Sequence, residues 1–201
     1  KHLCVGVQAN NVERDGSVKL NQNGEPQQLT GYKAPLVMHS KDGPSEEEQK
    51  ETDFLESLHE YVKTWAVENK ELIFTGKKKK KSDDAVMDMV SEPLYIGEDK
   101  DGNPKSPVLY AELMYYKNNN SMKTIFYGPG DKPIDPRKCS GYSLLEANIM
   151  ISCINITTNV IKMKMYIYDA VMEPLGNKGG PPKRLARKNE MEEVDDSDRD
   201  Q

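Results

Sequence analysis

The sequence predicts a mainly β protein (class α+β), an antiparallel meander or barrel that contains one long amphipathic helix and ends in a disordered tail. Two consecutive pairs of strand-like segments span residues 108–127 and 144–169, where apolar and polar side chains alternate as on half-buried strands. A helical repeat occupies residues 45–69, and apolar content falls beyond about residue 175. We therefore expect one folded domain in residues 1–175 and a disordered basic linker and acidic tail in residues 176–201.

The first forty residues predict two short strands separated by a polar loop. Residues 3–7 and 34–38 are the apolar segments, and Pro35 in the second favours a strand start or an edge, because proline has no amide proton to donate. Residues 10–28 are rich in Asn and Gln and carry two turn-forming Asp-Gly and Asn-Gly pairs. This stretch is interpreted as a hairpin or a long loop.

The helix in residues 45–69 has a start signal and one apolar face. Ser45 and Glu48 have the spacing of a capping box. The apolar positions recur at helical spacing, and we expect them to pack against a sheet: Phe54, Leu55, Leu58, Tyr61, Val62 and Trp65. The opposite face is acidic and would repel phosphate, so nucleic acid is not expected to run along it.

A lysine run follows the helix. Residues 72–74 suggest a short strand, and residues 84–90 a helical turn. Between them lie five consecutive lysines, Lys77, Lys78, Lys79, Lys80 and Lys81. Such a run is usually a solvated loop, but it can also act as a nuclear address or a phosphate clamp. It is not a P-loop, because the first glycine of that motif would fall at Glu71.

The strand that ends the second pair has an unusual outer face. Ile161, Met163, Met165 and Ile167 alternate with Lys162, Lys164, Tyr166 and Tyr168. Lysine neutralises phosphate, and tyrosine offers a ring on which a base can stack. Lys123 and Tyr127, on the return strand of the first pair, could add to this surface. The alternative is a solvated face on which long side chains cover the sheet. Because Lys162 and Lys164 are expected to face solvent, reversing their charge should weaken binding but barely change stability.

Composition narrows the classes of function. No segment approaches the roughly 18 consecutive apolar residues of a membrane span, and Cys4, Cys139 and Cys153 are too widely spaced for a disulfide framework or a zinc knuckle. Free thiols in a reducing, intracellular compartment are the simplest interpretation. No common catalytic or metal-binding motif is present, so we expect neither enzymatic activity nor a cofactor. The chain begins at Lys1 rather than at methionine, which suggests a processed or trimmed product.

The acidity is concentrated at the C-terminus. Residues 189–201 hold seven acidic residues against Arg199, a net −6, whereas the whole chain carries −5. Residues 1–188 therefore sum to about +1. A Gly-Pro linker with five basic residues, Lys178 to Lys188, precedes this block.

The order of these features resembles the single-stranded-DNA-binding proteins of large nucleocytoplasmic DNA viruses, of the African swine fever virus type. The resemblance covers residues 30–172 and rests on pattern: the residues around Pro35, the helix, the basic middle, and the final strand pair 146–152 and 162–168. It implies an OB-like barrel that binds single-stranded DNA, or possibly RNA, without sequence preference, in viral DNA replication, repair or recombination at a site in the host cytoplasm or nucleus. The acidic tail would compete for the groove and recruit replication proteins. The alternative is a viral structural or scaffold protein with no nucleic-acid role.

Overall fold

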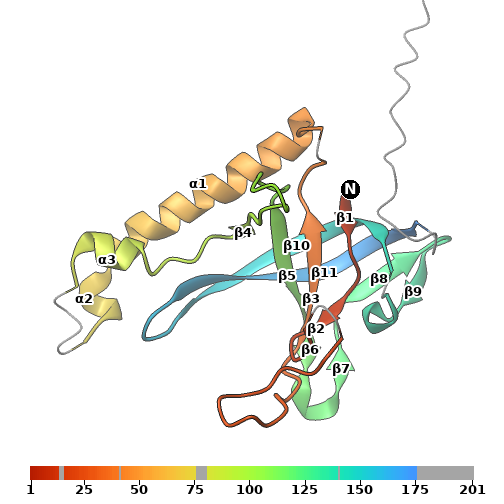
Figure 1. Ribbon diagram of the computed structural model, residues 1–201, viewed down its shortest axis with the longest axis horizontal. Coiled ribbons are helices and arrows are strands. Elements are labelled where there is room, and N and C mark those ends of the chain that lie inside the picture. The colour runs from red at the N-terminus through yellow and green to blue at the C-terminus, as the bar shows by residue number, and fades with distance from the viewer. Residues whose placement is uncertain (14–15, 41, 76–80, 140, 176–201) are drawn as a thin grey trace, which may run out of the picture.

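A closed five-stranded β-barrel forms the centre of the protein (Figure 1). The computed structural model describes residues 1–13, 16–40, 42–75, 81–139 and 141–175. The barrel strands are β1 (His2–Cys4), β3 (Tyr32–Val37), β5 (Val108–Leu113), β10 (Ser143–Ile156) and β11 (Ile161–Pro174). Counted along the chain, they pair in the order first, second, third, fifth, fourth and back to the first. The predicted mainly β class with one long helix is confirmed, while the predicted tail lies outside the described residues.

One pairing departs from the expected antiparallel arrangement. β5 runs parallel to β11, with Glu112 opposite Tyr166 and Leu113 opposite Ile167, and this contact closes the barrel. The other four barrel pairs are antiparallel. The barrel interior is packed with apolar side chains, of which Leu36, Leu145 and Ile167 are fully buried.

Shorter elements extend the barrel sheet at its edges. They are β2 (Gln8–Ala9), β4 (Leu94–Tyr95), β8 (Ile125–Gly128) and β9 (Lys132–Ile134), with a separate hairpin of β6 (Tyr115–Tyr116) and β7 (Ser121–Met122) and the 3-10 turns η2 (Lys117–Asn119) and η3 (Pro136–Lys138). The hairpin predicted over residues 108–127 is confirmed only at its tip, where β6 and β7 pair in antiparallel orientation around residues 117–120, and its longer arms do not pair with each other. β8 does not return along β5 but pairs in parallel with β11, because the β6–β7 hairpin takes up the reversal.

Pro35 lies inside a barrel strand rather than at its start or at a sheet edge. It faces Tyr110 of β5 on one side. On the other side β3 pairs with β2 at Lys33 and with β1 at Leu36, so Pro35 falls in the gap where the partner changes. A residue without an amide proton is tolerated where no partner strand needs one.

The long helix α1 (Glu46–Glu68) begins and ends as predicted, and Ser45 makes both hydrogen bonds of a capping box with Glu48. Its buried face is rotated from the predicted one. The buried positions are Thr52, Leu55, His59, Val62 and Ala66, whereas Phe54 and Tyr61 are 59% and 65% exposed. The smaller side chains of Thr52 and Ala66 lie on the buried face, whereas these two aromatic side chains lie on its flank.

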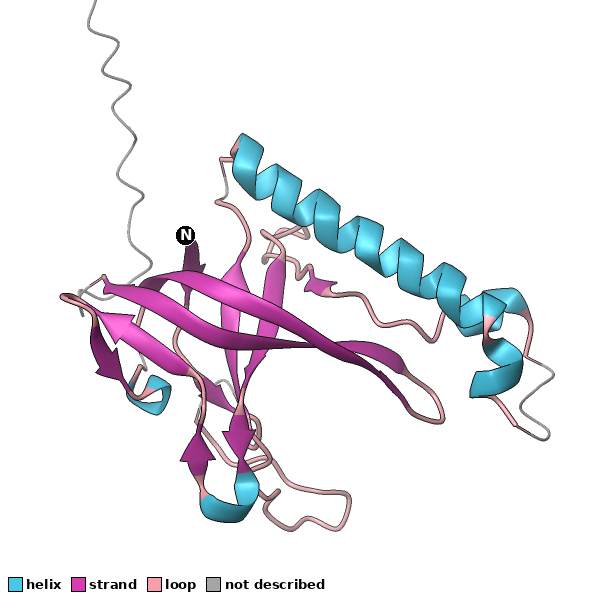
Figure 2. Ribbon diagram, turned by 180° about the vertical axis from the view of Figure 1, so that it is seen from behind, coloured by secondary structure: helices cyan, strands magenta, loops and turns pink. Residues whose placement is uncertain are grey.

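A second apolar cluster joins the helices to the tip of the β10–β11 hairpin. α2 (Lys70–Ile73) replaces the strand expected in residues 72–74, and α3 (Asp83–Met87) is the predicted helical turn. Phe74 and Val86 pack there against Ile161 and Met163 of β11. Figure 2 shows the long hairpin reaching toward these short helices, while α1 runs above it and ends beside them. His59 of α1 contributes a buried ring whose Nε2 lies 3.3 Å from the Val90 carbonyl oxygen.

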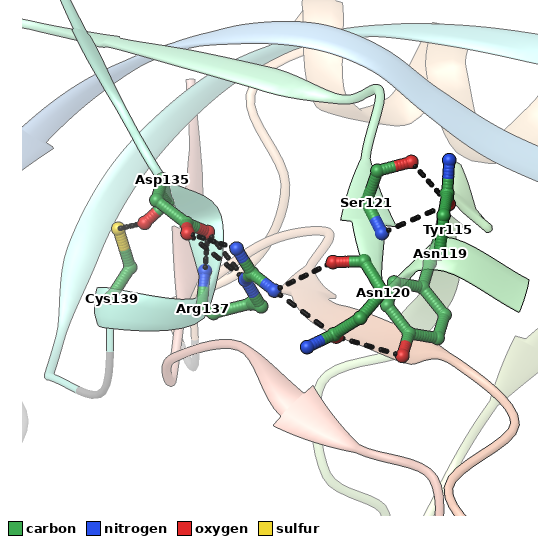
Figure 3. A network of polar contacts seen from close by, with 7 residues as sticks. All are labelled: Tyr115, Asn119, Asn120, Ser121, Asp135, Arg137 and Cys139. Atoms are coloured by element: carbon green, nitrogen blue, oxygen red, sulfur yellow. Dashed lines mark hydrogen bonds and ion pairs between the residues drawn. The ribbon is translucent and has the colours of Figure 1, made fainter. Parts of the chain in front are cut away.

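A polar network fixes the β6–β7 hairpin to η3 (Figure 3). The guanidinium of Arg137 donates to both carboxylate oxygens of Asp135, and its Nη1 donates to the Asn120 carbonyl oxygen at 3.2 Å. The Tyr115 hydroxyl donates to the Asn120 side chain at 3.0 Å. Asn120 has a φ of 52°, a left-handed conformation that asparagine tolerates well. Hydrogen bonds from Arg137 hold the pKa of Asp135 below its usual range.

We predict that Thr124→Val destabilises the barrel. The buried Thr124 hydroxyl donates to the Ile167 carbonyl oxygen at 2.6 Å and accepts from the Met114 amide at 2.8 Å, at the point where β11 changes partner from β5 to β8. Valine leaves both backbone groups unpaired, so the free energy of unfolding should fall by about 1–3 kcal/mol in a urea titration. Thr158→Val, at an exposed turn position, is the control and should stay within about 0.5 kcal/mol of wild type. A Thr124→Val protein as stable as this control would show that the two hydrogen bonds of the Thr124 hydroxyl do not stabilise the barrel.

Candidate nucleic-acid interface

The outer surface of β3, β5 and β11 gathers lysine and tyrosine side chains. Lys33 of β3 lies opposite Glu112 of β5, which in turn lies opposite Tyr166 of β11. Because successive side chains of a strand point to opposite faces, Tyr110 shares this outer face with Glu112, and Lys164 shares it with Tyr166. The inner faces of the same strands are buried in the barrel. The structure thus places three strands from distant parts of the chain side by side under one polar surface.

Aromatic rings on this surface lie in contact with one another and with a lysine. The Lys33 ammonium lies 4.5 Å from the centre of the Tyr110 ring, a cation–π geometry. The rings of Tyr110 and Tyr95 meet edge to face, with centres 6.1 Å apart. Tyr95 comes from β4 and is 58% exposed. Beside these rings a hollow of about 110 Å³ is lined by Ser91, Glu92, Pro93, Tyr95, Tyr110, Glu112, Lys162, Met163 and Met165.

The two strand lysines of β11 are not equivalent. The Lys164 ammonium donates to both carboxylate oxygens of Glu112 at 2.8 Å, and its side chain is only 26% exposed. Lys162 is 52% exposed and lies 3.8 Å from the same carboxylate. Burial alone would lower the pKa of Lys164, but the hydrogen bonds to Glu112 and its negative charge raise it. Lys164 is therefore a paired structural cation rather than a free surface lysine, which revises the expectation that substitution there barely changes stability.

The formal charge of the surface is only weakly positive. Lys33, Lys162 and Lys164 oppose Glu112 and Glu92, so three positive charges against two negative ones leave +1. Glu92 is partly engaged, since its carboxylate lies 3.3 Å from the buried His59 ring. A single-strand site on this face therefore needs further cations from nearby segments to follow a phosphate backbone.

The lysine run is the sequence's candidate for such cations. Lys77–Lys80 lie outside the described residues, but Lys81 is described, and its ammonium lies 5.9 Å from the centre of the Phe74 ring. Phe74 packs in the same apolar cluster as Ile161 and Met163. The described end of the run therefore lies near the tip of β11, on the side of Ile161 and Met163 and not on the side of Lys162.

The remaining predicted residues lie farther from Lys162, on β11, on β8 and in the link before β8. Tyr168 is 53% exposed and is the extra residue of a β-bulge, since Asn148 pairs with Asp169 and Ile149 with Ile167. Tyr127 lies opposite Val171, about nine residues or roughly 30 Å along the strand from Lys162. Lys123 is exposed in the link between β7 and β8. The structure therefore gathers Lys162, Lys164 and Tyr166 in one place, and sets Lys123 and Tyr127 at some distance from them.

Three residues of this surface were not predicted: Lys33, Tyr95 and Tyr110. The alternation of Tyr110 with Glu112 was visible in the sequence, but nothing there indicated that β5 lies beside β11 in parallel. Tyr95 belongs to a strand of only two residues, which is too short to have a periodic signal.

Other kinds of site find little support in the described part of the chain. No group of three or more His, Cys, Asp or Glu residues there could hold a metal ion, and none of the helices there is long and apolar enough to cross a membrane. The three cysteines are unpaired, and Cys4 and Cys139 are buried. Burial raises the pKa of the Cys4 thiol to about 11, so this thiol is protonated at neutral pH.

Fold and surface together define a β-barrel protein with a lysine–tyrosine face on three neighbouring strands. Residues 13–198 match the family described as "Protein of unknown function (DUF2738)". This match covers most of the chain, so the protein belongs to that family. The sequence matches no curated protein.

We predict that the two β11 lysines differ in their effect on stability. Lys164→Met removes the partner of the half-buried Glu112 and should lower the free energy of unfolding by about 1–2 kcal/mol. Lys162→Met removes the same charge from a more exposed position and should change it by less than about 0.5 kcal/mol. Urea titrations at neutral pH measure the free energy of unfolding of both variants. Equally small changes in the two would show that the Lys164–Glu112 pair contributes nothing to stability.

Proposed function

We propose that this protein binds single-stranded nucleic acid, with single-stranded DNA as the preferred ligand, without sequence preference. The observation that carries the proposal is the outer face of β3, β5 and β11, where Tyr110 and Tyr166, together with Tyr95 of β4, lie among lysines. Proteins that bind single strands in this way combine aromatic rings, on which bases of any sequence can stack, with cations along the backbone path.

The barrel topology supports the same proposal. A five-stranded Greek-key barrel is the architecture of the OB-fold, whose second and third strands form the face that binds oligonucleotides. In this protein the second and third barrel strands are β3 and β5, which carry Lys33 and Tyr110. One departure is the position of α1, which is inserted between these two strands in the chain. We therefore include in the proposal that this barrel is OB-like.

The biological setting follows from the sequence resemblance. A binder of this kind in a large DNA virus would serve DNA replication, repair or recombination inside the host cell, in a reducing compartment suited to three free cysteines. A scaffold or virion role without nucleic acid is the second candidate. The Lys164–Glu112 pair favours it, because an ion pair satisfied within the protein has less charge to offer a phosphate.

Binding to a fluorescent 20-nucleotide thymine strand, followed by anisotropy over a salt series, tests the proposal. If three to five phosphates are neutralised, log affinity should fall with log salt at a slope of about −2 to −3.5, which is about −0.7 per phosphate. Tyr110→Ala should cost about 1–3 kcal/mol of binding free energy through lost stacking, and Lys162→Glu should weaken binding and flatten the slope. Thymine and adenine homopolymers should differ only modestly.

Matched controls separate this surface from general charge effects. Lys138→Glu makes the same charge change on η3, which leads into the start of β10 and so lies by the opposite end of β11 from Lys162. Tyr116→Ala removes a tyrosine that is 54% exposed on β6. Both should bind as wild type does. Absence of binding at low salt would refute the proposal, as would a preference for duplex of one sequence.

Within this proposal we expect the acidic residues 189–201 to compete with DNA. The segment carries a net −6 and is tethered by a basic Gly-Pro linker, so its effective concentration at the lysine face is high. Deleting residues 189–201 should tighten binding at low salt, and the gain should shrink as salt screens the charges. If the full-length and truncated proteins have equal affinity across the series, the segment is a solubilising or partner-binding tail.

A further inference from the structure

The edge of β10 that faces away from β11 is unpaired over most of its length among the described residues. β10 pairs with β1 only over Ser143–Leu145, and from there to Ile156 its backbone pairs with β11 alone. Eleven residues of strand, roughly 37 Å, therefore present one open edge. An open edge is a ready template for another strand, and natural proteins usually protect one with lysine, proline or an overlying segment.

The side chains along this edge are apolar on the face toward α1. Ile149, Ile151, Ile154 and Ile156 lie opposite Ile167, Met165, Met163 and Ile161 of β11. The four β11 residues are at most 7% exposed, whereas Ile149, Ile151 and Ile156 are 39%, 43% and 38% exposed. The apolar surface of the sheet thus continues past the area that α1 covers.

The flank of α1 continues this apolar surface. A cavity of about 340 Å³ opens between the helix and the hairpin, and Phe54, Leu55, Ile149, Ile151 and Met165 line it together with His2 and other residues. Phe54 and Tyr61 are the large exposed aromatics of α1 and lie two helical turns apart on one side. The rotation of the helix's buried face therefore leaves Phe54 exposed at the cavity that adjoins the open edge.

We infer that this edge pairs with the same edge of a second copy of the chain, β10 against β10 in antiparallel orientation. Residues 147–156 contain no charged side chain, so self-pairing opposes no like charges. A two-fold axis brings identical patches together and satisfies both open edges at once. The two hairpins then form one continuous sheet. The exposed isoleucines of β10 in each copy pack beside those of the other copy and against Phe54.

Other occupants fit the edge less well. The remaining C-terminal residues of the same chain, 176–201, contain Gly179, Gly180, Pro181 and Pro182 followed by a charged segment, a composition unsuited to a strand. The dimer inference does not depend on nucleic-acid binding, and the two are tested separately.

Light scattering coupled to gel filtration of the full chain, at 10–100 µM as a rough range, tests the inference. Wild type should elute as a dimer of about 45 kDa, twice the chain mass of 22.7 kDa, and should remain so in about 1 M salt, because the contact is apolar. Ile151→Lys places a charge in the middle of the edge and should give a monomer.

The matched control is Ile125→Lys on β8, where the isoleucine is 41% exposed but the strand is paired on both sides, and it should remain dimeric. Circular dichroism and a thermal melt establish that each variant is folded. If Ile151→Lys does not fold, Ile149→Lys takes its place as the edge variant. A monomeric wild type would overturn the inference and leave the edge to the C-terminal residues or to another protein. A dimer that survives both edge substitutions while folded would also overturn it, by locating the contact elsewhere.

Discussion

The parallel contact between β5 and β11 is the constraint on which the rest of the structure depends. Only two residue pairs make this contact, Glu112 with Tyr166 and Leu113 with Ile167. Without it the strands would form an open sheet with two more edges, and the apolar interior that holds Ile167 would be accessible to water. The contact is supported by Thr124, whose hydroxyl links Ile167 to Met114 immediately beyond the pairing. Because β11 then continues along β8, one strand connects the barrel to its extension.

The same contact creates the candidate site. It brings Lys164 beside Glu112, and through β5 it brings Tyr110 and Lys33 next to the lysines of β11. The position of Glu112 has two consequences that oppose each other. Its carboxylate stabilises Lys164 in a half-buried place, and it removes positive charge from a face proposed to bind phosphate. A ligand phosphate would have to compete with Glu112 for Lys164, whereas Lys162 is more exposed and lies farther from that carboxylate.

The β10–β11 hairpin is longer than the barrel requires. Fourteen residues in each strand carry it beyond the other barrel strands, where α1, α2 and α3 cover one side of it through the second apolar cluster. This coverage is complete over β11 and incomplete over β10. Burying apolar area stabilises a protein by roughly 25 cal/mol per Å², so an exposed isoleucine row on an unpaired edge represents stabilisation that the isolated chain does not use. The two faces of the hairpin thus have separate roles, with the lysine–tyrosine face on one side and the apolar face on the other.

The sequence by itself determined the local features of this protein. Ser45 and Glu48 located the start of α1, and strict alternation located β11 and the polarity of its two faces, because these signals depend on neighbours within a few residues. Only the tertiary structure decided which strands lie beside one another. The parallel β5–β11 pairing, the placement of β8 and the ion pair between Glu112 and Lys164 join residues more than forty positions apart, and alternation is the same whichever partner a strand finds. The rotation of α1 was decided there too, because periodicity defines an apolar stripe, but packing in the second apolar cluster decides which side chains of the helix, among them Val62 and Ala66, are buried.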